Sequence, residues 1–172
     1  MDHGVRFVLI GGFAAAIRGS PVITGDVDIC YARDDENLQR LAAALTELEA
    51  TLWGAPSDDP FRRDAGSLKA GDPFTFATEG GPLDRIGTPP GTEGFADLDA
   101  SATDEDLDGL VVRVALVEDL IRMKRATGRP QRFALDSVGW GTARIVGAYG
   151  GGSAVGSPMV RPGRRRAWKR AR

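Results

Sequence analysis

The chain has 172 residues, of which 42% are hydrophobic and 27% are charged, with a formal net charge of −2; these values are typical of a soluble globular protein with a real core. Its single cysteine excludes an internal disulfide framework, and its single histidine makes His-based zinc sites and histidine acid–base catalysis poor hypotheses. Because no apolar stretch is long enough to cross a bilayer and no signal-peptide pattern is visible, we expect a cytoplasmic protein without a membrane partner.

A glycine pair follows the first predicted strand. Residues 5–10 are nearly all apolar, which predicts a strand buried on both faces. Gly11 and Gly12 come directly after it, and a short helix is predicted over residues 12–18. Glycine lets a backbone approach a phosphate closely, and the helix that follows offers free N–H groups to an anion. This turn therefore indicates a triphosphate-binding site; the alternative is a tight turn between strand and helix with no role in binding.

Two carboxylates lie on one face of the second predicted strand, residues 26–32. Side chains of a strand alternate, so Asp26 and Asp28 point to one face. Like charges at this spacing repel unless a cation lies between them, and Mg²⁺ prefers such oxygen ligands. The alternative is the solvent-facing side of an edge strand. The glycine turn upstream favours a metal site.

The pair Gly11-Gly12, thirteen residues and then Asp26-Val27-Asp28 resembles the signature of the DNA polymerase β-like nucleotidyltransferase superfamily. The stretch GGFAAAIRGSPVITGDVDI is most similar to the small bacterial nucleotidyltransferases grouped with abortive-infection and other toxin–antitoxin proteins. The resemblance implies an α/β (α+β) nucleotidyltransferase fold, with a small mixed sheet flanked by helices in one domain. It also implies a third metal-binding carboxylate on a later strand, for which Asp84 is the match.

The resemblance further implies an activity: two Mg²⁺ ions, held by the three aspartates, support transfer of a nucleoside monophosphate from a nucleoside triphosphate to a hydroxyl group. The acceptor would be RNA, such as a tRNA end, or a partner protein, as when an antitoxin modifies its toxin. In similar proteins a basic residue one turn past the glycines faces the triphosphate, and Arg18 matches it; a solvated helix end is the alternative. Thr24 precedes Asp26 and either shapes the site through its hydroxyl or only begins the strand.

The middle of the chain is expected to supply packing and the third carboxylate. Apolar residues at three- and four-residue spacing predict an amphipathic helix over residues 35–50, whereas residues 51–72 are predicted to be a loop or insertion. Strands are predicted over residues 74–78 and 83–87, joined by a glycine-rich turn. On the second of them Asp84 would lie beside the first two aspartates; the alternative is an exposed carboxylate on a hairpin.

Residues 88–109 show little periodicity, and their acidic part, residues 97–108, is predicted to be a solvated face or a mobile loop. A strand over residues 110–115 and a helix over residues 116–124 follow. Lys124, near the end of that helix, either contacts the nucleotide, as in similar proteins, or only interacts with the helix dipole.

The end of the chain departs from the pattern of similar proteins. They carry a Lys-Asp pair shortly after this helix, but Gln131-Arg132 stands here, and Asp136 is only a loose counterpart. This departure motivates a second hypothesis, a non-catalytic antitoxin-like or regulatory binding module that keeps the fold.

We expect a nucleotidyltransferase-like domain over residues 1–137 and a flexible, Gly- and Arg-rich tail over residues 138–172. The last twelve residues hold seven Arg or Lys, and the preceding 160 residues therefore carry 15 basic against 24 acidic side chains, a net charge of −9. Such a tail is a disordered terminus, a sequence-independent contact to RNA phosphates, or an aberrant extension of the chain.

Overall fold

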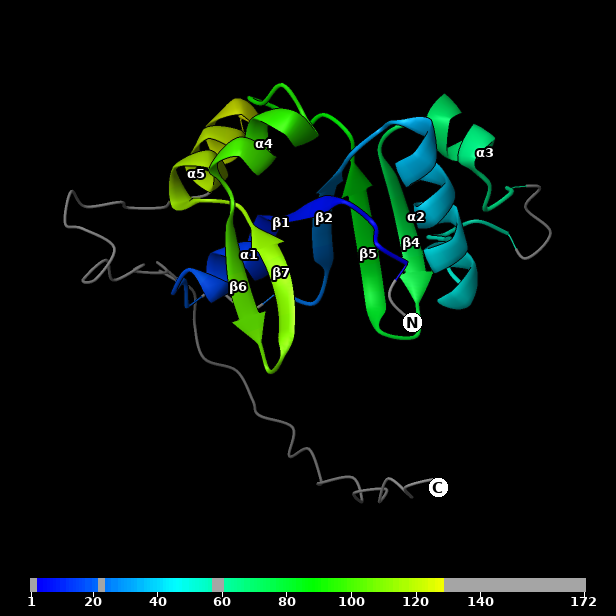
Figure 1. Ribbon diagram of the computed structural model, residues 1–172, viewed down its shortest axis with the longest axis horizontal. Helices are drawn as coiled ribbons and strands as arrows, with labels where there is room; N and C mark the ends of the chain where they lie inside the picture. The colour runs from blue at the N-terminus through cyan, green and yellow to red at the C-terminus, as the bar shows by residue number, and fades with distance from the viewer. Residues whose placement is uncertain (1–2, 22–23, 57–60, 129–172) are drawn as a thin grey trace, which may run out of the picture.

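The computed structural model describes residues 3–21, 24–56 and 61–128, and within these ranges the chain forms one mixed β-sheet with helices on both faces (Figure 1). The strands are β1 (Phe7–Ile10), β2 (Val27–Tyr31), β3 (Thr51–Leu52), β4 (Phe74–Thr78), β5 (Gly81–Ile86), β6 (Thr103–Leu107) and β7 (Leu110–Val114). The helices are α1 (Gly11–Ile17), α2 (Asp35–Glu47), α3 (Ala65–Ala70), α4 (Phe95–Ser101) and α5 (Val117–Ala126). This architecture confirms the predicted fold class. The predicted tail lies outside the described residues.

The order of the strands across the sheet is β3-β4-β5-β2-β1-β7-β6. Strand β2 lies in the centre, antiparallel to β1 and parallel to β5, and β1 is parallel to β7. The β4–β5 and β6–β7 pairs are antiparallel hairpins. The register of β2 on β5 places Asp28 directly opposite Asp84. Sheet topology thus brings together two carboxylates that are far apart in the sequence.

Alternate residues of β2 face different layers of the core. Tyr31 packs with α2 and α3 over the β4–β5 end of the sheet, and Ile29 packs with α1. Cys30 points to the opposite face, where it packs with Leu98 of α4 and Met123 of α5. Figure 1 shows the same arrangement, with α2 and α3 together at one end and α4 and α5 together near β1 and β7. Apolar side chains therefore fill both faces of β2 towards its C-terminal end, and its N-terminal end carries the acidic residues.

Helix α2 forms as its pattern predicts. The Asp34 side chain accepts a hydrogen bond from the backbone N–H of Asn37, which satisfies one of the free donors at the start of the helix. Leu38, Leu41 and Leu45 are buried against the sheet. This helix supplies packing and contributes no residue to the site described below.

The prediction of a loop over residues 51–72 was wrong in part. The short strand β3 extends the sheet beside β4, and α3 begins after Asp64, whose carboxylate accepts a hydrogen bond from the backbone N–H of Ser67. Leu68 is the only residue of this helix that is buried, and it is completely enclosed. One apolar anchor in six residues is too little for a periodicity signal, so the sequence did not reveal this helix.

The prediction of a solvated face or a mobile loop over residues 97–108 was wrong in part, because these residues form most of a helix and a strand, although much of the strand is exposed. Helix α4 buries Leu98, and the acidic run of residues 103–107 forms the edge strand β6 on β7. Acidic residues are poor strand formers. Here Arg18 donates a hydrogen bond to the Glu105 carboxylate, and Arg113 of β7 donates one to the Asp104 carboxylate. Charged side chains on an edge strand also protect it from pairing with other chains.

Candidate metal centre

Three carboxylates gather where β2 and β5 run side by side. Asp26 immediately precedes β2, Asp28 lies within it, and Asp84 lies on β5. One carboxylate oxygen from each lies within 4.8 Å of the others. We call these three residues the acidic cluster. The parallel β2–β5 pairing brings Asp84 to the pair, and strand periodicity places Asp26 and Asp28 on the same face.

The surroundings of the acidic cluster suit a cation. Burial first, and then the charges of Asp26 and Asp84, together raise the pKa of the Asp28 carboxyl to about 6, and a hydrogen bond from the Gly12 backbone N–H acts against them. The Asp84 Oδ1 atom is buried and has no hydrogen-bond partner among the described residues. A buried, unpartnered carboxylate oxygen beside two like charges fits a divalent cation, which prefers oxygen ligands.

Gly11 and Gly12 leave room for the acidic cluster. Gly11 has φ +66°, and a Cβ atom there would lie 1.9 Å from the Asp28 Oδ2 atom. A Cβ atom on Gly12 would lie 2.9 Å from the Cβ atom of Thr24. The Thr24 hydroxyl in turn donates a hydrogen bond to the Asp26 carboxylate. The glycine pair and Thr24 therefore shape the positions of the Asp26 and Asp28 carboxylates.

Arg18 lies at the end of α1, and its guanidinium contacts the β6–β7 hairpin. It donates hydrogen bonds to the backbone carbonyl oxygens of Ala115 (3.0 Å) and Val114 (2.8 Å) and to the Thr103 hydroxyl (2.7 Å), and it forms an ion pair with Glu105. Its side chain is only 15% exposed, so the alternative of a solvated helix end does not describe it. A contact with a triphosphate stays a prediction.

Lys124 lies in the last turn of α5, half-buried, and α5 packs beside α1. This position is compatible with either role that the sequence suggested, and nucleotide binding by Lys124 stays a prediction.

Sequence reasoning missed Thr103 and Glu105 as partners of Arg18, because both fall in the acidic run for which no regular strand was predicted. The Asp108-Gly109 pair, which stands directly before the apolar strand β7, is the signal that indicates a hairpin.

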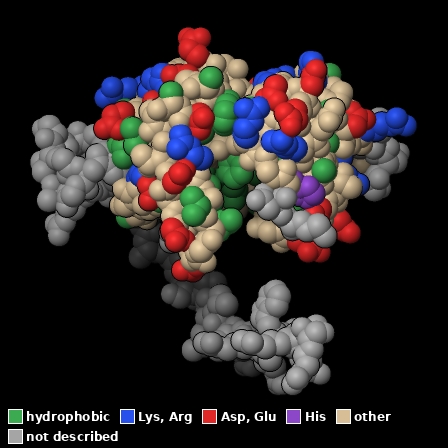
Figure 2. All heavy atoms as spheres, viewed as in Figure 1, with side chains coloured by type: hydrophobic (Ala, Val, Ile, Leu, Met, Phe, Trp, Pro, Cys, Tyr) green, Lys and Arg blue, Asp and Glu red, His purple; other side chains and the backbone are tan. Residues whose placement is uncertain are grey.

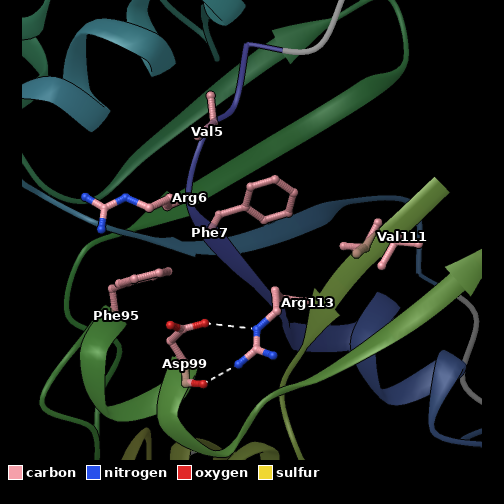
Figure 3. Close-up of a pocket in the computed structure, with 8 residues that line it drawn as sticks. Val5, Arg6, Phe7, Phe95, Asp99, Val111 and Arg113 are labelled. Atoms are coloured by element: carbon pink, nitrogen blue, oxygen red, sulfur yellow. Dashed lines mark hydrogen bonds and ion pairs between the residues drawn. The ribbon is translucent and has the colours of Figure 1, made fainter.

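Two hollows lie away from the acidic cluster, at the start of β1. The first has a volume of about 240 Å³, with Phe7 and Val111 on two of its sides and the Asp99–Arg113 ion pair along another (Figure 3). The second, of about 560 Å³, shares Phe95 and Asp99 with the first. In Figure 2 hydrophobic side chains are recessed near the middle of this face, among interspersed basic and acidic groups. The acidic cluster lies at the other end of β1, beyond Ile10.

Among the helices of the described residues, none is both long enough and apolar enough to cross a membrane.

Comparison with protein-family models and with curated proteins found no match. Among solved structures, the chain is similar to the crystal structure of a protein from Thermotoga maritima described as a "putative nucleotidyltransferase". The TM-score is 0.51 and the sequence identity is 17%, and the match covers 72% of this chain and 74% of that chain. At this identity the likeness concerns architecture alone. The chain has the nucleotidyltransferase fold.

Proposed function

We propose that this protein is a Mg²⁺-dependent nucleotidyltransferase that transfers a nucleoside monophosphate from a nucleoside triphosphate to a hydroxyl group. One observation carries the proposal: the acidic cluster brings three carboxylate oxygens within 4.8 Å of one another on the nucleotidyltransferase fold. The buried and unpartnered Oδ1 atom of Asp84 supports a cation at this place. Asp26, Asp28 and Asp84 would hold the metal.

In the proposed reaction the acceptor oxygen forms a bond to the α-phosphorus while the bond from that phosphorus to the oxygen bridging to the β-phosphate breaks, and pyrophosphate leaves. The hydroxyl proton passes to a carboxylate of the acidic cluster, for which Asp84 is the proposed base, and from there to water. Bound Mg²⁺ supplies charge stabilisation at the entering and leaving oxygens. Gly11 and Gly12 keep the carboxylate of Asp28 in place, and Thr24 and Lys124 are the further residues proposed for the nucleotide site.

The finer identity of the reaction rests on the sequence resemblance. The similarity of GGFAAAIRGSPVITGDVDI to the abortive-infection and toxin–antitoxin nucleotidyltransferases supports an acceptor that is RNA, such as tRNA, or a cognate toxin or antitoxin protein in the cytoplasm. The seven basic residues of the last twelve favour RNA, whereas the net charge of −9 on residues 1–160 favours a basic protein. The experiment below separates these two acceptors.

The test supplies each α-labelled nucleoside triphosphate and Mg²⁺ to the purified full chain, once with total RNA and once with cell protein. We expect label on one class of acceptor only, and loss of that label in Asp28→Asn. Asp35→Asn is the matched control, because Asp35 is an exposed aspartate on α2 that pairs with Lys69 far from the acidic cluster. Absence of transfer by a protein that still binds Mg·NTP would contradict the enzyme and support a binding module.

A further inference from the structure

The contacts of Arg18 join two parts of the molecule that are remote in sequence. Its Nε and terminal nitrogens reach the end of β7 at Val114 and Ala115 and the start of β6 at Thr103 and Glu105. Thr103 also donates a hydrogen bond of 2.9 Å to the Glu105 carboxylate, so the acceptors are themselves held together. The planar guanidinium fork suits such a set of fixed acceptors, which a lysine can satisfy only in part.

Helix α1 connects these contacts to the acidic cluster. Its first residues, Gly11 and Gly12, lie against Asp28 and Thr24, and Arg18 follows its last residue, Ile17. The helix is one compact segment of seven residues without a side-chain cap at its start. An isolated helix of this length is not stable, so its orientation depends on contacts with the rest of the fold. The Arg18 contacts fix its end against the β6–β7 hairpin.

We propose that Arg18 is a positioning residue that, together with Glu105, clamps α1 so that Gly11 and Gly12 hold Asp28 in the geometry of the metal centre. This inference rests on the proposed function and deepens it. Arg18 does not contact the triphosphate in this arrangement, because Glu105 neutralises its charge and the hairpin occupies its donors. Its effect on the reaction passes through α1 to the carboxylates.

The two roles of Arg18 predict different kinetics. If Arg18 acts as a clamp, Arg18→Gln and Glu105→Gln both lower kcat, by roughly 10- to 100-fold as expected for a small misplacement of reacting groups, and leave the KM for the triphosphate unchanged. The double variant is no worse than Arg18→Gln alone, because loss of the guanidinium already removes the contact with Glu105. Arg18→Lys recovers part of kcat. If Arg18 instead binds the triphosphate, Arg18→Gln raises KM whereas Glu105→Gln leaves or lowers it; this result would overturn the clamp.

Arg113→Gln is the matched control. Arg113 also holds the β6–β7 hairpin, through Asp104 and Asp99, but it joins the hairpin to α4 and not to α1. We expect this variant to leave kcat and KM unchanged. A loss of kcat in Arg113→Gln equal to that in Arg18→Gln would mean that general loosening of the hairpin explains the effect, and it would overturn the proposal.

Amide hydrogen exchange tests the clamp without any catalysis. In the full chain without nucleotide, Arg18→Gln and Glu105→Gln should both speed exchange at residues 12–17, and Arg113→Gln should not. Unchanged exchange in α1 for both clamp variants would overturn the proposal. If the wild-type protein transfers no nucleotide, the proposed function fails, and the exchange measurement alone decides whether the clamp exists.

Discussion

Strand β5 carries Asp84 on one face of the sheet and Arg85 on the other. Arg85 is completely buried, with its guanidinium carbon 4.2 Å from the ring centroid of Phe74 and 4.9 Å from that of Tyr31, whose hydroxyl accepts a hydrogen bond from it. Asp84 is half-buried among like charges, and one of its oxygens lacks a hydrogen-bond partner among the described residues. Two neighbouring charged residues thus have opposite surroundings.

The difference separates a structural charge from a functional one. Aromatic faces and a phenol oxygen enclose the Arg85 guanidinium, and the ring faces attract its positive charge, although its Nε atom has no hydrogen-bond partner among the described residues. The acidic cluster has carboxylates that destabilise one another and remain within reach of solvent. A single buried cation surrounded by aromatic rings is attracted by them and fills space in the core, whereas half-buried like charges repel one another, and a bound proton or cation relieves that repulsion.

The largest effect should come from removing a carboxylate of the acidic cluster. Asp84→Asn takes away one ligand and one negative charge, so we expect divalent-metal affinity to fall by more than the roughly 10- to 100-fold typical of changes around a metal's direct ligands. Calorimetric titration with Mn²⁺ measures it. Asp35→Asn should bind Mn²⁺ as the wild type does. Equal affinity in Asp84→Asn would show that this oxygen is not a ligand.

Substitutions of Arg85 should lower the free energy of unfolding and leave the affinity for Mn²⁺ unchanged. Arg85→Ala leaves a cavity beside Phe74 and Phe76, and we expect it to lower the free energy of unfolding by about 2–5 kcal/mol. Arg85→Met keeps most of the volume and should cost less than about 1.5 kcal/mol. Urea denaturation measures both values. A change in Mn²⁺ affinity of folded Arg85→Met would show that the two faces of β5 are not independent.

Gly11→Ala should affect both stability and metal binding, because it strains the backbone and displaces a ligand. Its positive φ should cost about 1–3 kcal/mol of unfolding free energy, and the added methyl group must push the Asp28 carboxylate away. Gly109→Ala is the matched control, since Gly109 also has a positive φ (+89°) but has open space around it. We expect the urea midpoint of Gly11→Ala to be the lower of the two, because only this variant adds a clash, and we expect a loss of Mn²⁺ affinity in Gly11→Ala alone. Equal Mn²⁺ affinities would show that the clash relaxes elsewhere.

Local patterns predicted the strand that carries Asp28 and one helix that supplies packing. Period-two alternation predicted the facing of Asp28 and Ile29, and three- and four-residue spacing predicted α2. The proximity of Asp84 is a matter of sheet topology, since β5 pairs in parallel with a strand more than fifty residues earlier. Only the resemblance to a known family suggested it before the structure did.

The elements that were missed owe their stability to contacts from remote residues. The edge strand β6 has the composition of a solvated loop, and its Glu105 is paired with Arg18 across more than eighty residues of chain. Helix α4 begins at a glycine without a side-chain cap, and its burial depends mainly on Leu98. Single-sequence periodicity cannot register such contacts, because the compensating charge and the apolar partner lie elsewhere in the chain.

The smallest effect we predict concerns the pH dependence of stability, and it isolates Asp28. Its carboxyl pKa is about 6 in the folded protein against an ordinary value of 3.8, chiefly because of burial. The folded state therefore holds this proton more tightly than the unfolded state, so the free energy of unfolding falls as pH rises from about 4 to 6 and stays lower above that window. Without metal, the penalty at pH 8 should be about 1–3 kcal/mol.

Asp28→Asn removes this ionisation, and it should be more stable than the wild type at pH 8 by the same amount and nearly equal to it at pH 4. Urea denaturation in the presence of a chelator measures the difference. Saturating Mg²⁺ should then stabilise the wild type and leave Asp28→Asn nearly unchanged, because only the wild type keeps the full ligand set. Parallel stability curves for the two proteins between pH 4 and 8 would mean that the acidic cluster is better solvated than its burial indicates, and that a cation has little repulsion to relieve there.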